Sequence, residues 1–481
     1  TTSMACVAMA VVVAASLAGC PPKVVTIPDL AGLSQAAAET ALAEEGFAVG
    51  NVITVYSDTV DKGNVVRQTP DAGTPGEGVT EVALSVSDGP QPAADGVKLG
   101  YVGSARCGQC HTDIYADFVR SGHPYKVNRV ANGVPPKVPF AIPVAKGLGD
   151  TPNDNAESNT PAPPDGYTWD AISYIIGGYG WKARFMDTKG NILTDYTGDL
   201  QGTRLTQWNP PTQEWVSYSP HDSGDKPYTC GECHTTAWEA ATSEQIEEFE
   251  NNVDKFQDGL SGIHGTWSEP GIHCESCHGP GEAHAGSPSS ENIELVLTDA
   301  PDALISKRCG ACHTRDAQNR IEVSSNMDFI RHHEQYDELI NGGHAALTCV
   351  TCHDPHKPTK FAPEEGIIAQ CTDCHEASEY EITSGGMQGL ACIDCHMPAT
   401  GKSAVAFNAN RGDVKSHIFK MNTTAAAKDD PDGMFFEDTD GKIVSRGYIT
   451  LDFVCLSCHD GGDAFALTLE AAASGAAGFH D

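Results

Sequence analysis

Positive charge is scarce in this chain of 481 residues. It holds 30 Lys and Arg against 65 Asp and Glu, which gives a formal net charge of −35 at pH 7. An excess of negative charge this large argues against nucleic acid and against anionic lipid surfaces as binding partners. The length is sufficient for two or more domains.

Long hydrophobic runs are also missing, apart from residues 5–17, which are small, apolar and uncharged. That run is too short to cross a bilayer and is typical of the apolar region of a signal peptide. It leads into Leu17, Ala18, Gly19 and Cys20, which resemble a bacterial lipobox. We expect 1–19 to be a lipoprotein-type signal peptide and Cys20 to carry lipid. A plain secretory signal with an incidental cysteine is the alternative.

Spare cysteines are absent from the rest of the chain. Of the 18 cysteines, all but Cys6 and Cys20 belong to eight copies of the motif Cys-x-x-Cys-His. None is left in the mature body for a disulfide or for a separate metal site. The eight copies are Cys107, Cys110 and His111; Cys230, Cys233 and His234; Cys274, Cys277 and His278; Cys309, Cys312 and His313; Cys349, Cys352 and His353; Cys371, Cys374 and His375; Cys392, Cys395 and His396; and Cys455, Cys458 and His459.

This motif is the attachment site of a c-type haem, in which two thiols bind the vinyl groups and the histidine binds the iron. A single copy would also fit a structural zinc site or a redox dithiol. Zinc sites do not need His after every second Cys, and redox dithiols occur once or twice. Eight copies therefore predict eight covalently attached haem c groups. Haem is attached outside the cytoplasm, which agrees with export.

The histidines outside the motifs are numerous enough to supply second axial ligands. The chain has 19 histidines, so 11 lie outside the eight motifs, and a low-spin haem needs one more ligand each. We expect these ligands among His123, His264, His284, His332, His333, His344, His356 and His417. His264 is preferred over His221 and His273. His480 is either disordered or a ligand donated across a subunit contact.

The spacing of His356 carries a geometric consequence. It follows His353 by three residues, which is too few to reach around a porphyrin to its other face. His356 should therefore bind a different haem, so that two haems lie close together. The same reasoning applies to His284 and His344, whereas His123 can reach its own haem or another.

Residues 24–90 are expected to form a small α+β domain of order β-α-β-β-β. Ser34 is placed to cap a helix that Gly46 ends, and three alternating, β-branched segments follow. Through "IPDLAGLS", "VYSDTV", "QTPDAGT" and "LSVSDGP" the region resembles a PASTA domain. Such domains bind cell-wall muropeptides or act as spacers, and a single copy leaves both roles open. Residues 91–100 are expected to be a linker.

Residues 101–481 are expected to be an octahaem domain of short helices and loops with a β-hairpin insert. Residues 131–166 should be loop, 167–218 should form the hairpin around the "TKGN" turn, and 236–256 and 329–341 should be helical. The insert is rich in aromatic side chains. They are a candidate substrate platform, but packing against each other or a haem is favoured; they are Trp169, Tyr174, Trp181, Trp208 and Trp215.

Several segments of 101–420 resemble a family of bacterial multihaem c-type cytochromes related to the tetrahaem electron acceptor of hydroxylamine oxidoreductase. They are "YVGSARCGQCHTDIYADFVRSGHPYKV", "GGYGWKARF", "YTCGECHTTAW", "GTWSEPGIHCESCHGPGEAH" and "ALTCVTCHDPH". The resemblance implies electron transfer through a chain of haems, mostly with two histidine ligands each.

Two functions follow from these observations. The favoured one is an electron-transfer protein that is not an enzyme, because every motif ends in His and histidines are in surplus. It would be lipid-anchored in the periplasm or at the cell surface, with redox proteins or an extracellular acceptor as partners and end-to-end self-association. The alternative is an octahaem oxidoreductase acting on nitrite, hydroxylamine or a sulfur oxyanion.

Overall fold

The computed structural model describes residues 25–55, 60–87, 89, 98, 100–140, 160, 162–196, 204–219, 224–294, 307–315, 319–376, 387, 389–460 and 465–477. Cys20, His221 and His480, with the predicted signal peptide, lie outside the described residues. The chain divides into two compact units. Residues 25–52 and 63–86 belong to the first unit, and the second holds all eight motifs.

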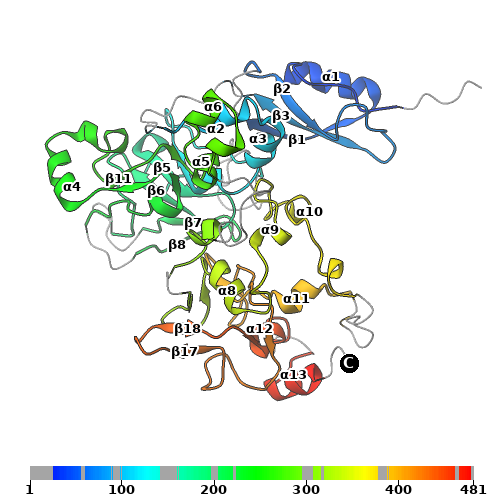
Figure 1. Ribbon diagram of the computed structural model, residues 1–481, viewed down its shortest axis with the longest axis vertical. Helices are drawn as coiled ribbons and strands as arrows, with labels where there is room; N and C mark the ends of the chain where they lie inside the picture. Colours follow the sequence, from blue (N-terminus) through cyan, green and yellow to red (C-terminus); the bar gives the residue numbers. More distant parts are fainter. Residues whose placement is uncertain are drawn as a thin grey trace, which may run out of the picture. The chain divides into compact units, whose positions relative to one another are not determined.

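The N-terminal unit is one helix on a three-stranded sheet (Figure 1). Helix α1 (Gln35–Glu45) begins at Ser34, whose hydroxyl accepts the Ala37 N–H, and ends at Gly46, where φ is 90°. Both ends were predicted from the sequence and are confirmed. The sheet order is β1 (Ala48–Val55), β3 (Glu81–Ser87), β2 (Val65–Thr69). The predicted first strand is reduced to an isolated bridge between Thr26 and Pro75.

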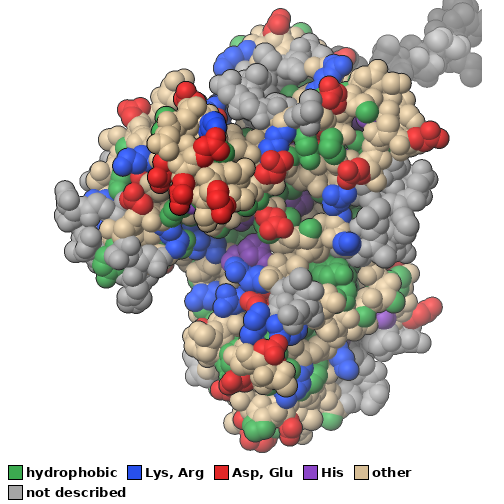
Figure 2. All heavy atoms as spheres, turned by 60° about the vertical axis from the view of Figure 1, so that its left-hand side comes forward, with side chains coloured by type: hydrophobic (Ala, Val, Ile, Leu, Met, Phe, Trp, Pro, Cys, Tyr) green, Lys and Arg blue, Asp and Glu red, His purple; other side chains and the backbone are tan. Residues whose placement is uncertain are grey.

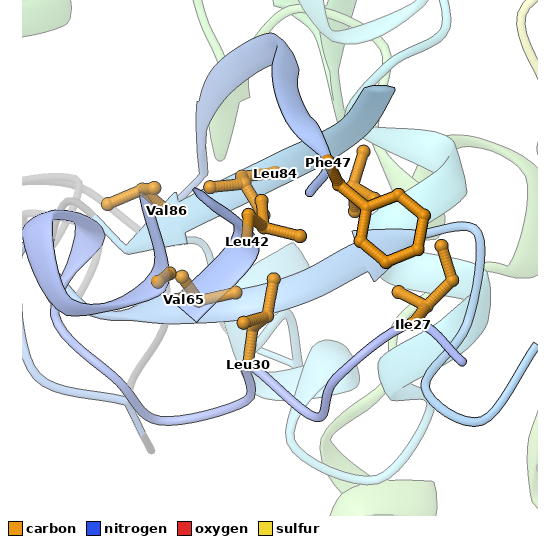
Figure 3. Packing of buried hydrophobic residues seen from close by; sticks show 9 residues of the cluster. Ile27, Leu30, Leu42, Phe47, Val65, Leu84 and Val86 are labelled. Carbon is orange, nitrogen blue, oxygen red and sulfur yellow. The ribbon is translucent and has the colours of Figure 1, made fainter. Parts of the chain in front are cut away.

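A continuous hydrophobic core holds this unit together (Figure 3). Leu42 of α1 points toward Leu84 of β3, while Leu30 and Val65 approach from the opposite side. Leu30, Leu42 and Val65 are completely buried. Burying one such side chain stabilises a fold by about 1.5–3 kcal/mol. The core of the N-terminal unit is therefore built from protein side chains.

The second unit contains a five-stranded antiparallel sheet of order β4-β5-β6-β7-β8. Gly177 and Gly178 make the turn between β5 and β6 with φ of 80° and 94°, a conformation that side chains with a Cβ rarely adopt. The predicted "TKGN" turn also forms, after β6, and leads to a bridge between Met186 and Ile192. The insert is thus a larger sheet than the predicted hairpin; its strands are Val127–Arg129, Ile172–Gly177, Ala183–Asp187, Gln207–Asn209 and Glu214–Val216.

The aromatic residues of the sheet pack against each other, as favoured from the sequence. Phe185 contacts Trp169 and Trp215, and Trp208 contacts Trp215, with ring centroids 5.5–6.4 Å apart. Tyr174 instead meets Trp267 edge to face at 5.5 Å. These side chains therefore form core rather than an open platform.

The remaining strands of this unit are short. A three-stranded sheet has the order β13-β18-β17, and four two-residue ladders pair β10 with β11, β12 with β9, β14 with β15 and β16 with β19. Their bounds are β9 Thr235–Thr236, β10 Glu239–Ala240, β11 Gly265–Thr266, β12 Glu269–Pro270, β13 Ile321–Glu322, β14 Ile330–Arg331, β15 Gly401–Lys402, β16 Met421–Asn422, β17 Phe435–Glu437, β18 Ile443–Ser445 and β19 Ile449–Thr450.

The helices of the second unit are short too, as predicted. Two of the expected helices begin later than the sequence indicated. Within 236–256 only α4 (Ser243–Glu250) is α-helical, because β10 precedes it and pairs with β11; within 329–341 only α8 (Gln335–Asn341) is, because β14 precedes it. The other labelled α-helices are α2 Ser104–Gly108, α3 Thr112–Phe118, α5 Cys274–His278, α6 Glu282–Gly286, α9 Cys349–Cys352, α10 Pro363–Gly366, α11 Cys392–His396, α12 Leu451–Val454 and α13 Leu469–Ala476.

Candidate haem-binding site

Short helical turns carry most of the attachment motifs. Helices α5, α9 and α11 begin at the first cysteine of their motifs, and 3₁₀ turns hold Gly231–Cys233 and Cys371–Asp373. Each of the eight motifs occupies a short helix or a turn. Their cysteines remain accessible. All sixteen thiols are free and are exposed or half-buried. The buried hydrophobic clusters of this unit contain none of them.

Five motif histidines each face one histidine from outside the motifs. The ring centroids of each pair are 6.0–6.4 Å apart. The partners come from distant parts of the chain in most cases. The pairs are His111 with His284, His313 with His123, His278 with His356, His375 with His344, and His353 with His417.

This separation fits one iron held between two imidazoles. With metal–nitrogen bonds of about 2 Å and a ring half-width of about 1.1 Å, the two centroids should be about 6.3 Å apart. Direct contact between two rings would bring them closer, as in the neighbouring pair His332 and His333, whose centroids are 3.8 Å apart. The residues present therefore fit haem groups with two histidine ligands.

His356 does not face His353. Its ring is nearly parallel to that of His278, with an angle of 10°, while His353 faces His417. This arrangement is the one that the three-residue spacing predicted. Ligation of iron by these residues stays a prediction.

Thiols of different motifs lie beside each other. Cys107 lies beside Cys274, Cys309 beside Cys349 and Cys312 beside Cys233, and the neighbouring thiol raises the pKa of the first thiol of each pair. Burial, followed by the charge of a neighbouring motif's thiolate, raises the pKa of Cys352, Cys371 and Cys455. Those neighbours are Cys374, Cys392 and Cys395, respectively.

Electrostatic interactions between these thiols link all eight motifs, numbered in chain order. The first lies beside the third, and the third beside the fourth, because Cys277 acts on Cys309 and Cys312. The fourth also meets the second and the fifth. The row then continues through the sixth and seventh to the eighth.

His234 of the second motif has different surroundings. Among the described residues, neither His234 nor His459 of the eighth motif has a histidine ring facing it at the distance seen in the five pairs, and His234 differs in the charges around it. Burial chiefly lowers the pKa of His234, to about 3, and nearby positive charges add to the effect. Those charges belong to Lys126, Lys182, Arg184 and Arg315. Figure 2 shows histidine side chains in a hollow of the surface that Lys and Arg side chains border.

This basic cluster was not recognised in the sequence, because its members are scattered from 126 to 315 in an acidic chain. Three of the four are partly held in place. Lys182 Nζ donates to the Ser403 carbonyl at 2.9 Å, Arg184 Nε donates to Gln207 Oε1 at 2.9 Å, and Lys126 lies over the Trp181 ring. Burial lowers the pKa of Lys182 to about 7.

Three predicted ligands are placed without a facing motif histidine among the described residues. His264 lines a cavity of about 410 Å³ beside α4, together with Lys189, Asp225 and Glu250. His332 and His333 are adjacent and half-buried, and His333 lies near enough to His234 for the two charges to interact. Their roles as axial ligands stay predictions. His273, which was disfavoured, has Nε2 3.0 Å from the Pro270 carbonyl oxygen.

The second nitrogen of several imidazoles has a defined partner. Neutral oxygens face Nδ1 of His284, His313, His396 and His459 at 2.8–3.1 Å. Carboxylates face two of the non-motif histidines instead. Asp354 Oδ1 lies 3.3 Å from His356 Nδ1, and Glu338 Oε2 lies 3.8 Å from His417 Nδ1.

Comparison with known proteins agrees with this division of the chain. Residues 25–88 match the model of the PASTA domain. A probable serine/threonine-protein kinase of Clostridium acetobutylicum is 38% identical over 66 residues, which is 14% of this chain and 10% of the kinase. The C-type polyheme cytochrome OmcB of Geobacter sulfurreducens is 29% identical over 124 residues, which is 26% of this chain and 13% of OmcB. The matches thus span a small part of either protein.

Solved structures similar to this chain include the octaheme sulfite reductase MccA of Wolinella succinogenes and the outer cell wall cytochrome OcwA. MccA is 18% identical with a TM-score of 0.49, over 76% of this chain and 66% of MccA. OcwA is 17% identical with a TM-score of 0.45, over 78% of this chain and 86% of OcwA.

The chain therefore has a PASTA domain at its N-terminus, followed by a body of short helices and loops like that of multihaem c-type cytochromes. The eight motifs, the five histidine pairs and the similarity to a polyhaem cytochrome all point to that class. None of the helices in the described part of the chain is long and apolar enough to span a membrane.

Proposed function

We propose that the body binds eight haem c groups and conducts electrons along them. The observation that carries this proposal is the continuous series of motif contacts together with five histidine pairs spaced for iron. Haem groups supply one-electron redox chemistry when bound. A shuttle needs a single haem, whereas a row of eight is useful when an electron must cross a distance.

The protein's own residues supply the conditions for rapid transfer. Two imidazoles on one iron keep its geometry nearly the same in both oxidation states, so little reorganisation accompanies transfer. The paired histidines are His111, His123, His278, His284, His313, His344, His353, His356, His375 and His417. Each pair joins segments that are fixed by separate elements, and this holds the rings apart at the required distance.

The haem count and the ligation are tested together on the exported protein. A pyridine haemochrome assay should give eight haems per chain, and the oxidised protein should show predominantly low-spin signals in electron paramagnetic resonance (EPR). A count well below eight, or mostly high-spin iron, would contradict the proposal.

We also propose that the electrons leave the cell, from a chain anchored by lipid on Cys20 in the periplasm or at the outer surface. The signal-like residues 1–19 and the lipobox resemblance support the anchor. The Cys20→Ala variant should be released from the membrane fraction, because one lipid anchor on an acidic body leaves little other membrane affinity.

Reduction of a bulky acceptor that cannot enter the periplasm tests the outward direction of electron transfer. Light scattering tests the proposed end-to-end assembly, in which His480 would reach a neighbouring subunit.

One observation favours a second function at the second motif. His234 faces a cluster of basic residues and has no described histidine partner at ligand distance. An iron held only by His234 would have a free position, and Lys126, Lys182, Arg184 and Arg315 would attract a small anion to it. This fits an oxidoreductase acting on nitrite or a sulfur oxyanion better than on neutral hydroxylamine.

Two measurements separate this second function from pure conduction. One high-spin iron out of eight in the oxidised protein, sensitive to added nitrite or sulfite, would favour it. The variant Lys182→Gln should then weaken the spectral response to the anion, while the exposed Lys415→Gln should not. If all eight irons are low-spin and neither anion changes the spectrum, the second function is excluded.

A further inference from the structure

We propose that the carboxylate of Asp354 lowers the reduction potential of the haem held between His278 and His356. This inference rests on the proposed function, because it requires His356 to be an axial ligand. The carboxylate of Asp354 would act on the haem through His356.

The contacts around His356 carry the argument. Asp354 Oδ1 lies 3.3 Å from His356 Nδ1 and also accepts the backbone N–H of His356 at 3.0 Å. The backbone bond fixes the carboxylate in front of the ring. Nε2, the other nitrogen of the imidazole, is the one left to face His278, whose ring lies 6.2 Å away at an angle of 10°.

A carboxylate at this position changes the ligand's basicity. A negative oxygen 3.3 Å from Nδ1 gives the imidazole more anionic character, and carboxylate partners raise the basicity of metal-bound histidine. A more basic ligand stabilises Fe(III) over Fe(II) and lowers the potential, and second-shell hydrogen bonding is one of the means by which proteins tune haem. Lys357 Nζ lies 3.8 Å from the other oxygen and offsets part of the charge.

The other pairs provide the contrast within the molecule. His313 Nδ1 faces the neutral amide oxygen of Gln335 at 3.1 Å, and His284 Nδ1 faces the Ser289 carbonyl oxygen at 3.0 Å and Asn292 Oδ1 at 3.2 Å. A carboxylate also lies near His417, but Glu338 Oε2 is 3.8 Å from its Nδ1, beyond hydrogen-bond range. The effect should therefore be stronger at the His278–His356 pair.

The angle between paired rings narrows the test to two of the five pairs. Nearly parallel ligand planes split the iron d orbitals widely and give a rhombic EPR signal, whereas nearly perpendicular planes give one broad low-field feature. Two pairs are nearly parallel, His278–His356 at 10° and His111–His284 at 19°. Two are nearly perpendicular, His123–His313 at 82° and His344–His375 at 78°.

The experiment is a redox titration of the full haem-loaded protein, followed by EPR. In Asp354→Asn one rhombic signal should titrate at a higher potential than in the wild type. Asp354→Glu should restore the lower potential, since it keeps the carboxylate. The matched control is Glu364→Gln, which removes an exposed carboxylate from α10 and should leave every signal in place.

The outcomes separate this inference from the proposed function. Unchanged potentials in Asp354→Asn would overturn it, and so would conversion of the signal to high spin, which would show that Asp354 holds the ligand rather than tuning it. The variant His356→Ala tests ligation itself. If it produces no high-spin iron, the ligand assignment fails, independently of any shift in potential.

Discussion

The PASTA domain and the haem-binding body are held together in different ways. In the N-terminal unit nine buried hydrophobic residues form one cluster, and helix α1 covers a three-stranded sheet. In the body the described hydrophobic residues form separate clusters, and many strands are two residues long. Elements this short bury too little apolar surface by themselves to offset the entropy of ordering the chain. The difference indicates that the body depends on its cofactors and that the PASTA domain does not.

Removing haem should have the largest effect on this contrast. When the chain is produced in a compartment without haem attachment, we expect the body to be digested by protease while a fragment containing residues 25–88 survives. Limited proteolysis with mass spectrometry measures this, and the haem-loaded chain is the control. Equal resistance of both units without haem would refute the comparison.

A core substitution should have the reverse effect. Leu42→Ala removes a completely buried side chain and should cost the PASTA domain about 2–5 kcal/mol of unfolding free energy. Far-ultraviolet circular dichroism in denaturant would follow this loss, and the haem absorption spectrum should be unchanged. Disturbed haem spectra at denaturant concentrations that melt only the PASTA domain would contradict the independence of the two folds.

Removal of a single second axial ligand tests the body more locally. His356→Ala should leave eight haems attached and turn one of them high-spin, namely the one bound by His278 rather than by His353. EPR of the oxidised protein measures the change. His273→Ala is the control, because its ring bonds to a backbone carbonyl and should not alter any spin state. An unaltered spectrum in His356→Ala would show that His356 is not a ligand.

The smallest expected effect is the loss of stability when a helix cap is removed, compared between two helices. The hydroxyl of Ser34 caps α1, which buries Ala38 and Leu42, whereas Thr242 caps α4, which has no buried residue. Ser34→Ala should lower the stability of the PASTA domain by about 1 kcal/mol. Thr242→Ala should change neither the PASTA melting transition nor the haem spectrum. Similar losses from both variants would mean that α4 supports its unit more than its exposed surface suggests.

The sequence predicted the PASTA domain closely, because its signals are local. Ser34 and Gly46 mark the ends of α1, and alternation marks the three strands. Prediction was weaker where pairing with distant segments decides the structure. Residues 236–242 were expected to be helical but include β10, whose partner β11 begins at Gly265. The first predicted PASTA strand is followed at once by Pro28, which lacks an N–H for a ladder, and only the bridge between Thr26 and Pro75 forms there.

The sequence alone predicted where haem would be attached, because two thiols and a histidine at fixed spacing are a local pattern. It also determined that His356 could not serve the haem of His353, since three residues cannot reach around a porphyrin. Only the tertiary structure decided which histidine faces which. A second ligand would have to approach from the opposite face of the haem and so from a separate segment, and His417, which faces His353, lies in such a segment. The same holds for the basic residues around His234, which are brought together only by folding.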